Sequence, residues 1–166
     1  FPGGGIEASE YLSTVLGRTE GDAPRFDMSE ELAVQEACLR LITNGVVQSA
    51  HDVSDGGLLI ALAEMSLASD NLGAQIDLAP VASGRMDGLL FSEAQSRIVL
   101  SISPERLSRA QELVASMPVE MVRIGVVADG QFTVKVAGTT VLDIAPEAMN
   151  DIYENALPNR MSNKLK

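Results

Sequence analysis

The 166-residue chain is short of the residues that build several common functional sites. Cys38 is its only cysteine and His51 its only histidine. These counts exclude an internal disulfide, and they exclude a zinc site of the Cys/His type, because such a site takes about four of these ligands. A single cysteine also fits a reducing compartment, and we expect a cytoplasmic location.

Basic and aromatic side chains are scarce as well. The sequence has 12 lysine and arginine residues against 23 aspartate and glutamate residues, which gives a formal net charge of −11, and only 4% of its residues are aromatic. This charge would repel a phosphate backbone, and nucleic-acid bases would find few side chains to stack on. We therefore expect no nucleic-acid partner.

Long apolar runs are also missing. Ser, Glu or Gly interrupts the longest apolar stretches within about ten residues, whereas a membrane-spanning helix needs roughly twenty. The segment from Phe1 to Gly5 has neither the basic start nor the apolar core of a signal peptide. We expect no membrane partner, and the opening phenylalanine indicates a fragment of a longer protein.

The residues that are present predict one compact α/β domain after a lead-in segment. Residues 1–27 are rich in glycine and charge around one short helical stretch, EYLSTVLG, and we expect this segment to dock on a neighbouring domain. In residues 28–166, about six strands alternate first with helices and later with hairpins. This order predicts a mixed sheet covered by helices. Within it, VVQSAHDV and GAQIDL are expected strands, one helical turn is expected from Met86 to Phe91, and a helix is expected from Gly56 to Ser69.

Capping and breaking residues set the expected limits of the elements. Ser29 is the expected N-cap of the first long helix, and Ser103 is the expected N-cap of a later one. The last helix should stop before Pro158, because proline lacks the N–H group that a helix interior uses. Glycines at 130 and 138 predict hairpins that join the last three strands.

One stretch, AHDVSDGGLLIALAEM from Ala50 to Met65, gathers versatile side chains at a predicted strand-to-helix junction. His51, Asp52 and Ser54 are the residue types of a catalytic triad. However, the nucleophile elbow needs a glycine two positions before the serine, where Asp52 stands, and a triad draws its members from separated segments. We therefore expect no serine-hydrolase triad in this loop.

Two other interpretations of this loop stay open. The glycine pair allows close approach to backbone N–H groups at a helix start, where the helix dipole favours an anion. The two aspartates nearby would repel a phosphate unless a magnesium ion or a lysine intervened. Alternatively, Ser54 or Asp55 only caps the helix. The candidates for a nucleotide or phosphate cleft are His51, Asp52, Ser54, Gly56 and Gly57.

A second polar cluster, FSEAQSR, precedes a predicted strand. Alternation along a strand would place Glu93, Gln95 and Arg97 on one face. That face either binds a ligand or forms a surface ion pair, and the residue pattern alone favours the ion pair.

Several stretches in consistent order resemble one enzyme family. AHDVSDGGLLIALAEM, GAQIDL, LLFSEAQSRIVLSI, IGVV and IYENALP resemble the C-terminal segment of the large synthetase subunit of phosphoribosylformylglycinamidine synthase, and EASEYLSTVLGR fits the same place. The resemblance extends over nearly the whole chain. It implies a three-layer α/β fold of the aminoimidazole ribonucleotide synthetase C-terminal-domain type, partly ferredoxin-like.

The resemblance also implies a function for the longer protein. The family converts formylglycinamide ribonucleotide, ATP and glutamine-derived ammonia to formylglycinamidine ribonucleotide. The implied cofactors are ATP and Mg²⁺, and the implied partners are the other domains of the same polypeptide, a glutaminase subunit and a small accessory subunit. The catalytic histidines and the main ATP and Mg²⁺ ligands belong to other domains, so the fragment alone should be inactive.

The resemblance implies substrate-side candidates as well. A sister domain in the family offers a Glu-Ser-Gln element to the substrate, and this chain has Glu93-Ala94-Gln95 at the matching position, followed by Arg97. Two alternatives stay open. The chain could come from another member of the superfamily, of the aminoimidazole ribonucleotide synthetase or selenophosphate synthetase type, or it could be a non-catalytic interaction or regulatory α/β module.

Overall fold

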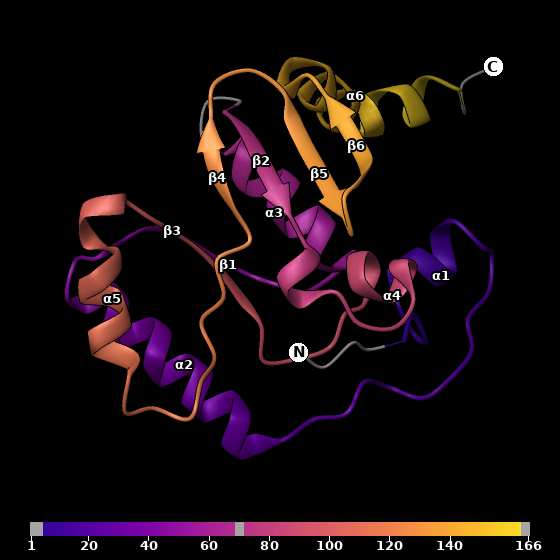
Figure 1. Cartoon of the computed structure of the whole chain (residues 1–166). Coiled ribbons are helices and arrows are strands. Elements are labelled where there is room, and N and C mark those ends of the chain that lie inside the picture. Colours follow the sequence, from indigo (N-terminus) through magenta and orange to yellow (C-terminus); the bar gives the residue numbers. More distant parts are fainter. Residues whose placement is uncertain (1–4, 69–71, 164–166) are drawn as a thin grey trace. The chain divides into compact units, whose positions relative to one another are not determined.

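The computed structural model describes residues 5–68 and 72–163, which fall into two compact units. Unit 1 comprises residues 1–62 and 81–123, and unit 2 comprises residues 63–80 and 124–166. Helix α3 (Gly57–Leu67) begins in unit 1 and ends in unit 2 (Figure 1). The lead-in segment falls in unit 1, and the domain boundary expected at residue 27 stays a prediction.

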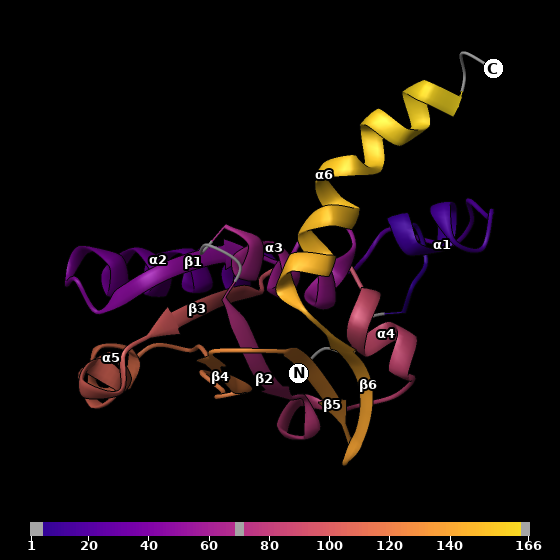
Figure 2. The ribbon, with the colours of Figure 1, turned by 90° about the horizontal axis from the view of Figure 1, so that it is seen from above.

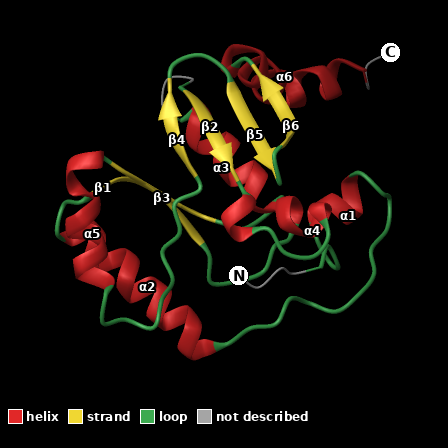
Figure 3. Cartoon of the chain, in the orientation of Figure 1, coloured by secondary structure: helices red, strands yellow, loops and turns green. Residues whose placement is uncertain are grey.

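Unit 1 is built from helices and a two-stranded ribbon. Strands β1 and β3 pair antiparallel from Val47 opposite Ile102 to Asp52 opposite Ile98. Figure 3 shows helix α2 beside helix α5. The elements of unit 1, besides the first part of α3 and short 3₁₀ turns, are α1 (Glu10–Thr14), α2 (Met28–Thr43), β1 (Val47–Asp52), α4 (Met86–Phe91), β3 (Ile98–Ile102) and α5 (Leu107–Val114).

The core of unit 1 lies where α2 and α5 meet the start of the ribbon. The side chains share an apolar character and little exposure, as at Leu41, which is 2% exposed. Burial of such groups is the main favourable contribution to folding. The buried members of the cluster are Ala37, Leu41, Val46, Ala110 and Val114.

The N-cap of helix α2 lies two residues earlier than the sequence predicted. The expected N-cap, Ser29, lies inside the helix, and Asp27 is the N-cap instead. The Asp27 Oδ1 atom accepts hydrogen bonds from the backbone N–H groups of Ser29, at 2.9 Å, and Glu30, at 3.2 Å. The prediction of Ser29 as the N-cap was wrong because Asp27 is an equally good capping residue. The Ser29 hydroxyl donates its hydrogen bond to the Asp27 carboxylate and does not cap the backbone.

The Asp27 cap should make the stability of α2 depend on pH. Hydrogen bonds from the Ser29 hydroxyl, from backbone N–H groups and from Arg25 lower the pKa of Asp27 from 3.8 to about 2. The depressed pKa means that the ionised cap stabilises the helix above pH 3.8 and is lost as the pH falls toward 2. We expect Ser29→Ala to raise this pKa toward 3.8, measured by NMR titration of the carboxyl carbon.

A matched control for this titration is Ser108→Ala, which removes an exposed hydroxyl from helix α5 in the same unit. It should leave the Asp27 midpoint in place. An Asp27 midpoint that does not move in Ser29→Ala would contradict the assignment of the Ser29 hydroxyl as the main cause of the shift.

Unit 2 is a four-stranded mixed sheet with a long helix. The strand order is β4-β2-β5-β6, in which β2 runs parallel to β5 and the other pairs are antiparallel (Figure 1). Buried residues alternate along β5, at Phe132, Val134 and Val136, as expected when one face of a strand is covered. The elements are β2 (Gly73–Asp77), β4 (Gly125–Ala128), β5 (Phe132–Val136), β6 (Thr139–Ile144) and α6 (Pro146–Asn163).

One of the two predicted hairpins is wrong. The chain turns at Ala137 and Gly138, both with positive φ, and joins β5 to β6 as an antiparallel hairpin. At Gly130, however, β4 and β5 do not pair with each other, because β2 lies between them and bonds to both. A glycine turn signal reports a change of direction, and the pairing of β2 with both strands is a long-range feature that the turn does not encode.

The last helix continues past the residue that was expected to end it. Helix α6 runs to Asn163 with Pro158 inside it, and Figure 2 shows it as one long helix. Proline removes one backbone hydrogen bond, but residues 151–162 are all exposed, so water can satisfy the carbonyl that loses its partner. The helix therefore tolerates the proline.

The mixed α/β class predicted from the sequence is confirmed, although the strands form two sheets. The expected helical turn at Met86–Phe91 is present as α4, and the strands predicted around VQSAHD and GAQID are present as β1 and β2. The helix that was expected to extend to Ser69 is described only to Leu67, and position 69 lies outside the described residues. None of the helices in the described part of the chain combines the length and apolar character needed to cross a membrane.

Candidate functional site

The loop between β1 and α3 is a tight turn at the start of a helix. The Val53 N–H donates to the carbonyl oxygen of Arg97 at 3.0 Å, and the Gly57 N–H donates to the carbonyl oxygen of Ser54 at 3.0 Å. Both Gly56 and Gly57 have φ near the left-handed region, at +79° and +73°. Such φ values are strained for residues with a Cβ atom, so the local conformation requires glycine.

Gly57 is also held close to a neighbouring backbone. A Cβ atom added at Gly57 would lie 2.6 Å from the carbonyl carbon of Phe91 and 2.7 Å from the carbonyl oxygen of Ser92. These are backbone atoms, so they cannot rotate away as a side chain could. The second glycine of the pair therefore allows the start of α3 to pack against the end of α4.

The polar side chains of this loop face the surface to different degrees. His51 is half-buried, and its Nδ1 atom lies 2.6 Å from the carbonyl oxygen of Asp52. The Asp52 side chain is 74% exposed, and Ser54 and Asp55 are exposed. Two solvated carboxylates therefore stand next to the glycine pair, as the sequence indicated.

The amide of Gly56 is engaged by a carboxylate of the same chain. The Oε1 atom of Glu93 accepts the Gly56 N–H at 2.8 Å, and the same atom accepts the N–H of Glu10 at 2.8 Å. One donor that a phosphate would use is thus already paired with an internal anion. The Glu93 carboxylate also places negative charge beside this donor, which disfavours a phosphate there in this conformation. The assignment of His51, Asp52, Ser54, Gly56 and Gly57 to a cleft stays a prediction.

Arg97 is a buried structural cation in this conformation, and the interpretation as a surface ion pair is wrong. Its side chain is 9% exposed, with Nε donating to the carbonyl oxygen of Ala94 at 3.0 Å and Nη2 donating to that of Ser92 at 2.6 Å. Burial lowers the pKa of the guanidinium. The segment Ser92–Arg97 is a turn and not a strand entry, because β3 begins only at Ile98.

A second contact anchors this turn to α2. Ser96 has a positive φ of +63°, which sets its hydroxyl to donate to the Oε2 atom of Glu31 at 2.7 Å. That bond, together with one from Gln35, lowers the pKa of the Glu31 carboxyl. The alternation expected for Glu93, Gln95 and Arg97 fails here because the backbone bends at residues 95–96, with Ser96 in a left-handed conformation, and is not extended before the strand starts.

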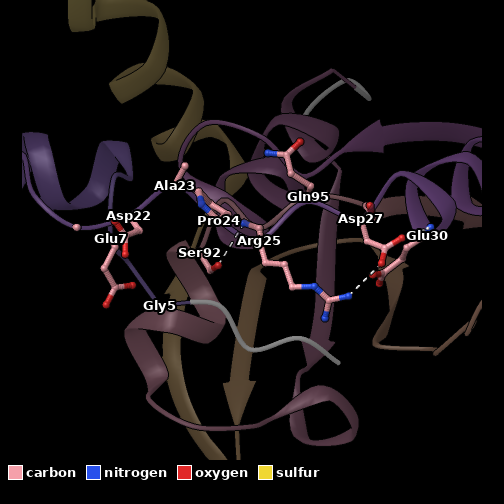
Figure 4. Close-up of a pocket in the computed structure, with 13 residues that line it drawn as sticks. Gly5, Glu7, Asp22, Ala23, Pro24, Arg25, Asp27, Glu30, Ser92 and Gln95 are labelled. Atoms are coloured by element: carbon pink, nitrogen blue, oxygen red, sulfur yellow. Dashed lines mark hydrogen bonds and ion pairs between the residues drawn. The ribbon is translucent and has the colours of Figure 1, made fainter.

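A cavity of about 530 Å³ lies within unit 1, beside this turn. Figure 4 shows the Gln95 side chain among its lining residues, and Gln95 is the only one of the eight site candidates in that lining. The walls come from the lead-in segment, the first residues of α2 and the Ser92–Ser96 turn: Gly5, Glu7, Gly21 to Arg25, Asp27, Glu30, Ser92, Ala94, Gln95 and Ser96.

The charge of the cavity limits what it can bind. Four carboxylates line it, those of Glu7, Asp22, Asp27 and Glu30, against the single guanidinium of Arg25. The guanidinium is paired with Asp27, at 3.1 Å between Nη2 and Oδ2. An excess of negative charge disfavours a phosphate and favours neutral polar or cationic groups.

The sequence analysis did not predict that the lead-in segment lines this cavity. The stretch EGDAPRFD, residues 20–27, is rich in charge and turn residues, but nothing in its pattern indicates that it lies beside a turn about 70 positions later. Across residues 5–68 and 72–163, no group of three or more His, Cys, Asp or Glu side chains is placed to hold a metal ion.

Comparison with known proteins gives a consistent family. The domain described as "AIR synthase related protein, C-terminal domain" matches residues 1–137. The phosphoribosylformylglycinamidine synthase subunit PurL of Salinibacter ruber is 46% identical over 157 residues, which is 94% of this chain and 21% of that protein. The chain thus spans about a fifth of the length of the curated relatives that it matches.

Solved structures agree with the sequence comparison. Thermotoga maritima PurL complexed with FGAR superposes with a TM-score of 0.68 at 26% identity, over 80% of this chain and 23% of that one. Other structures of that PurL are complexed with ATP and with ADP. The PurLQS structure from the same organism matches with a TM-score of 0.59 at 25% identity, over 86% of this chain and 24% of that one. The chain belongs to the family of AIR synthase-related proteins, as a C-terminal domain of that family.

Proposed function

We propose that this chain is one domain of a PurL-type subunit of phosphoribosylformylglycinamidine synthase. The observation that carries the proposal is the 46% identity to Salinibacter ruber PurL over 94% of the chain. This identity favours PurL over the aminoimidazole ribonucleotide synthetase and selenophosphate synthetase alternatives.

The proposed reaction belongs to the longer protein. Formylglycinamide ribonucleotide, ATP and ammonia give formylglycinamidine ribonucleotide, ADP and phosphate, with the phosphoryl group of ATP carrying away the amide oxygen that ammonia replaces. When bound, ATP would supply the activating phosphoryl group and Mg²⁺ would neutralise the charge of its phosphates, and we propose that other domains hold both. Solved structures of a relative support this proposal, since Thermotoga maritima PurL is complexed with FGAR and with ATP.

This domain's own part in the proposed function is to form a wall of the substrate site. Gln95 offers an amide to the cavity, and the acidic lining there suits a neutral polar part of a substrate better than its phosphate. Arg97 and Glu93 act behind that wall, through the turn that positions Gln95. The domain supplies no catalytic group in this proposal.

The proposed partners follow from the relatives. The PurLQS structure of Thermotoga maritima contains PurL in a complex, and we propose that the longer protein assembles in the same way with a glutaminase subunit and a small accessory subunit. The remaining domains of the same polypeptide complete the site. The cytoplasmic location expected from the sequence stays a prediction.

A domain exchange tests the proposed function. The matching 157-residue segment of Salinibacter ruber PurL is replaced by the aligned segment of this chain, and ATP-dependent formation of formylglycinamidine ribonucleotide from ammonia is measured. We expect the chimera to turn over, because a wall built from the same family can replace its relative. The free 166-residue chain should form no product.

The same chimera with Gln95→Ala tests whether Gln95 contacts the substrate. Loss of an amide that contacts substrate should raise KM, with an effect on transition-state binding of about 1 kcal/mol, typical of one hydrogen bond. A folded chimera without any turnover would contradict the proposed function, and an unchanged KM in Gln95→Ala would contradict the assigned wall.

A further inference from the structure

The end of α4 joins two segments that are far apart in the sequence. On one side, the ring of Phe91 stacks on the ring of Tyr11 in α1, with centroids 4.2 Å apart and planes 5° apart. On the other side, the backbone of Phe91 packs against Gly57. Two residues on, the Glu93 carboxylate accepts an N–H from each side, from Glu10 and from Gly56. All of these groups lie in unit 1.

Helix α1 depends on these contacts for its order. It has five residues, from Glu10 to Thr14, and an isolated helix of that length is not stable in water. What fixes it is local capping by Ser9, the burial of Leu12 to 6% exposure, and the contacts to Phe91 and Glu93. Weakening the contact with Phe91 or Glu93 should therefore loosen the helix.

The glycine loop depends on the same carboxylate. The Gly56 N–H precedes the first turn of α3, where no carbonyl of the helix can accept it. Glu93 supplies the acceptor, and its negative charge also complements the positive end of the helix. One oxygen atom thus caps the start of α3 and the start of α1 together.

We propose that Glu93 is a latch and that α1 is a strap held by it, so that release of α1 loosens the Gly56–Gly57 loop. Because the two N–H groups share one acceptor atom whose position Phe91 and Tyr11 help to fix, the loop and the strap open as one cooperative unit. The inference does not rest on the proposed synthase function, since it concerns only contacts within unit 1.

Amide hydrogen exchange of the full 166-residue chain, measured residue by residue with NMR, tests this inference. In Glu93→Ala we expect exchange at Glu10 and at Gly56 to become about tenfold faster or more, the loss typical of a hydrogen bond to a charged group. The Tyr11 ring stacks on the ring of Phe91, and Tyr11→Ala removes this contact. Exchange at Gly56 should also become faster in Tyr11→Ala. The amide of Val114, in the core of unit 1, should not change.

Matched controls separate the latch from general destabilisation. Glu120→Ala removes an exposed carboxylate and Tyr153→Ala removes a ring that is 57% exposed, and neither should alter exchange at Gly56. If Glu93→Ala also raises exchange at Val114, Glu93→Met replaces it, because methionine keeps the length of the side chain and removes both acceptor oxygens, and it is judged by the same criteria. Unchanged exchange at Gly56 in the Glu93 variant, or faster exchange at Glu10 without Gly56 in Tyr11→Ala, would overturn the proposal.

Discussion

Gly57→Ala is expected to destabilise unit 1 by about 2 to 4 kcal/mol, the sum of a left-handed φ and an overpacked contact. The added Cβ atom would approach the backbone of Phe91 to 2.6 Å, and φ at Gly57 is +73°. Because the opposing atoms are backbone, relief requires α3 to move away from the end of α4. Urea unfolding followed by circular dichroism measures the loss.

Gly45→Ala is the matched control for this experiment. Gly45 lies in the same unit with a similar φ of +67°, but a Cβ atom there would meet nothing within 4 Å. Gly45→Ala should therefore lower the free energy of unfolding only by the cost of the left-handed φ, about 1 kcal/mol. Equal losses for the two substitutions would show that the close approach at Gly57 has no energetic consequence.

Arg97→Ala is expected to cost about 3 kcal/mol or more of the free energy of unfolding. The substitution takes a charged donor away from two carbonyl oxygens, those of Ser92 and Ala94, and leaves a hole at a site that is 9% exposed. Arg97→Lys should recover only part of this loss, because a single ammonium group cannot reproduce the planar fork of the guanidinium. Urea unfolding again gives the measurement.

Arg109→Ala provides the comparison for Arg97. Arg109 pairs with Glu112 at 3.1 Å on the surface of unit 1, where both side chains are more than half exposed. Such a pair contributes about 0.5 kcal/mol. If Arg97→Ala cost no more than Arg109→Ala, the buried guanidinium would not be holding the Ser92–Arg97 turn.

The elements that local pattern determines were predictable from the sequence. The alternation in VQSAHD and GAQID, and the short apolar run in MDGLLF, depend on neighbouring residues, and β1, β2 and α4 form there. The insertion of β2 between β4 and β5 was not predictable, because sheet order depends on contacts between residues far apart in the chain. The prediction that the last helix stops before Pro158 was wrong for another reason: an exposed helix can lose one backbone hydrogen bond and continue, because water satisfies the carbonyl group.

The candidate site shows the same division. The glycine pair was correctly placed at a strand-to-helix junction, because both flanking patterns are local. The partner of Gly56 was not predictable, since Glu93 is 37 residues away and carries a charge that pattern alone assigns to the surface. For Arg97, the signal was misleading, because long charged side chains are rarely buried unless they are paired, and here backbone carbonyls are the described partners.

The kcat of the PurL chimera with and without His51→Ala tests the central claim most directly. His51 is the only histidine of the chain and its most versatile acid–base group. If the domain supplies a wall and no catalytic group, kcat should change by less than about tenfold, well below the 10² to 10⁴ that a positioned acid or base typically contributes. A loss of about 10² or more in a folded chimera would contradict the account and place chemistry in this domain.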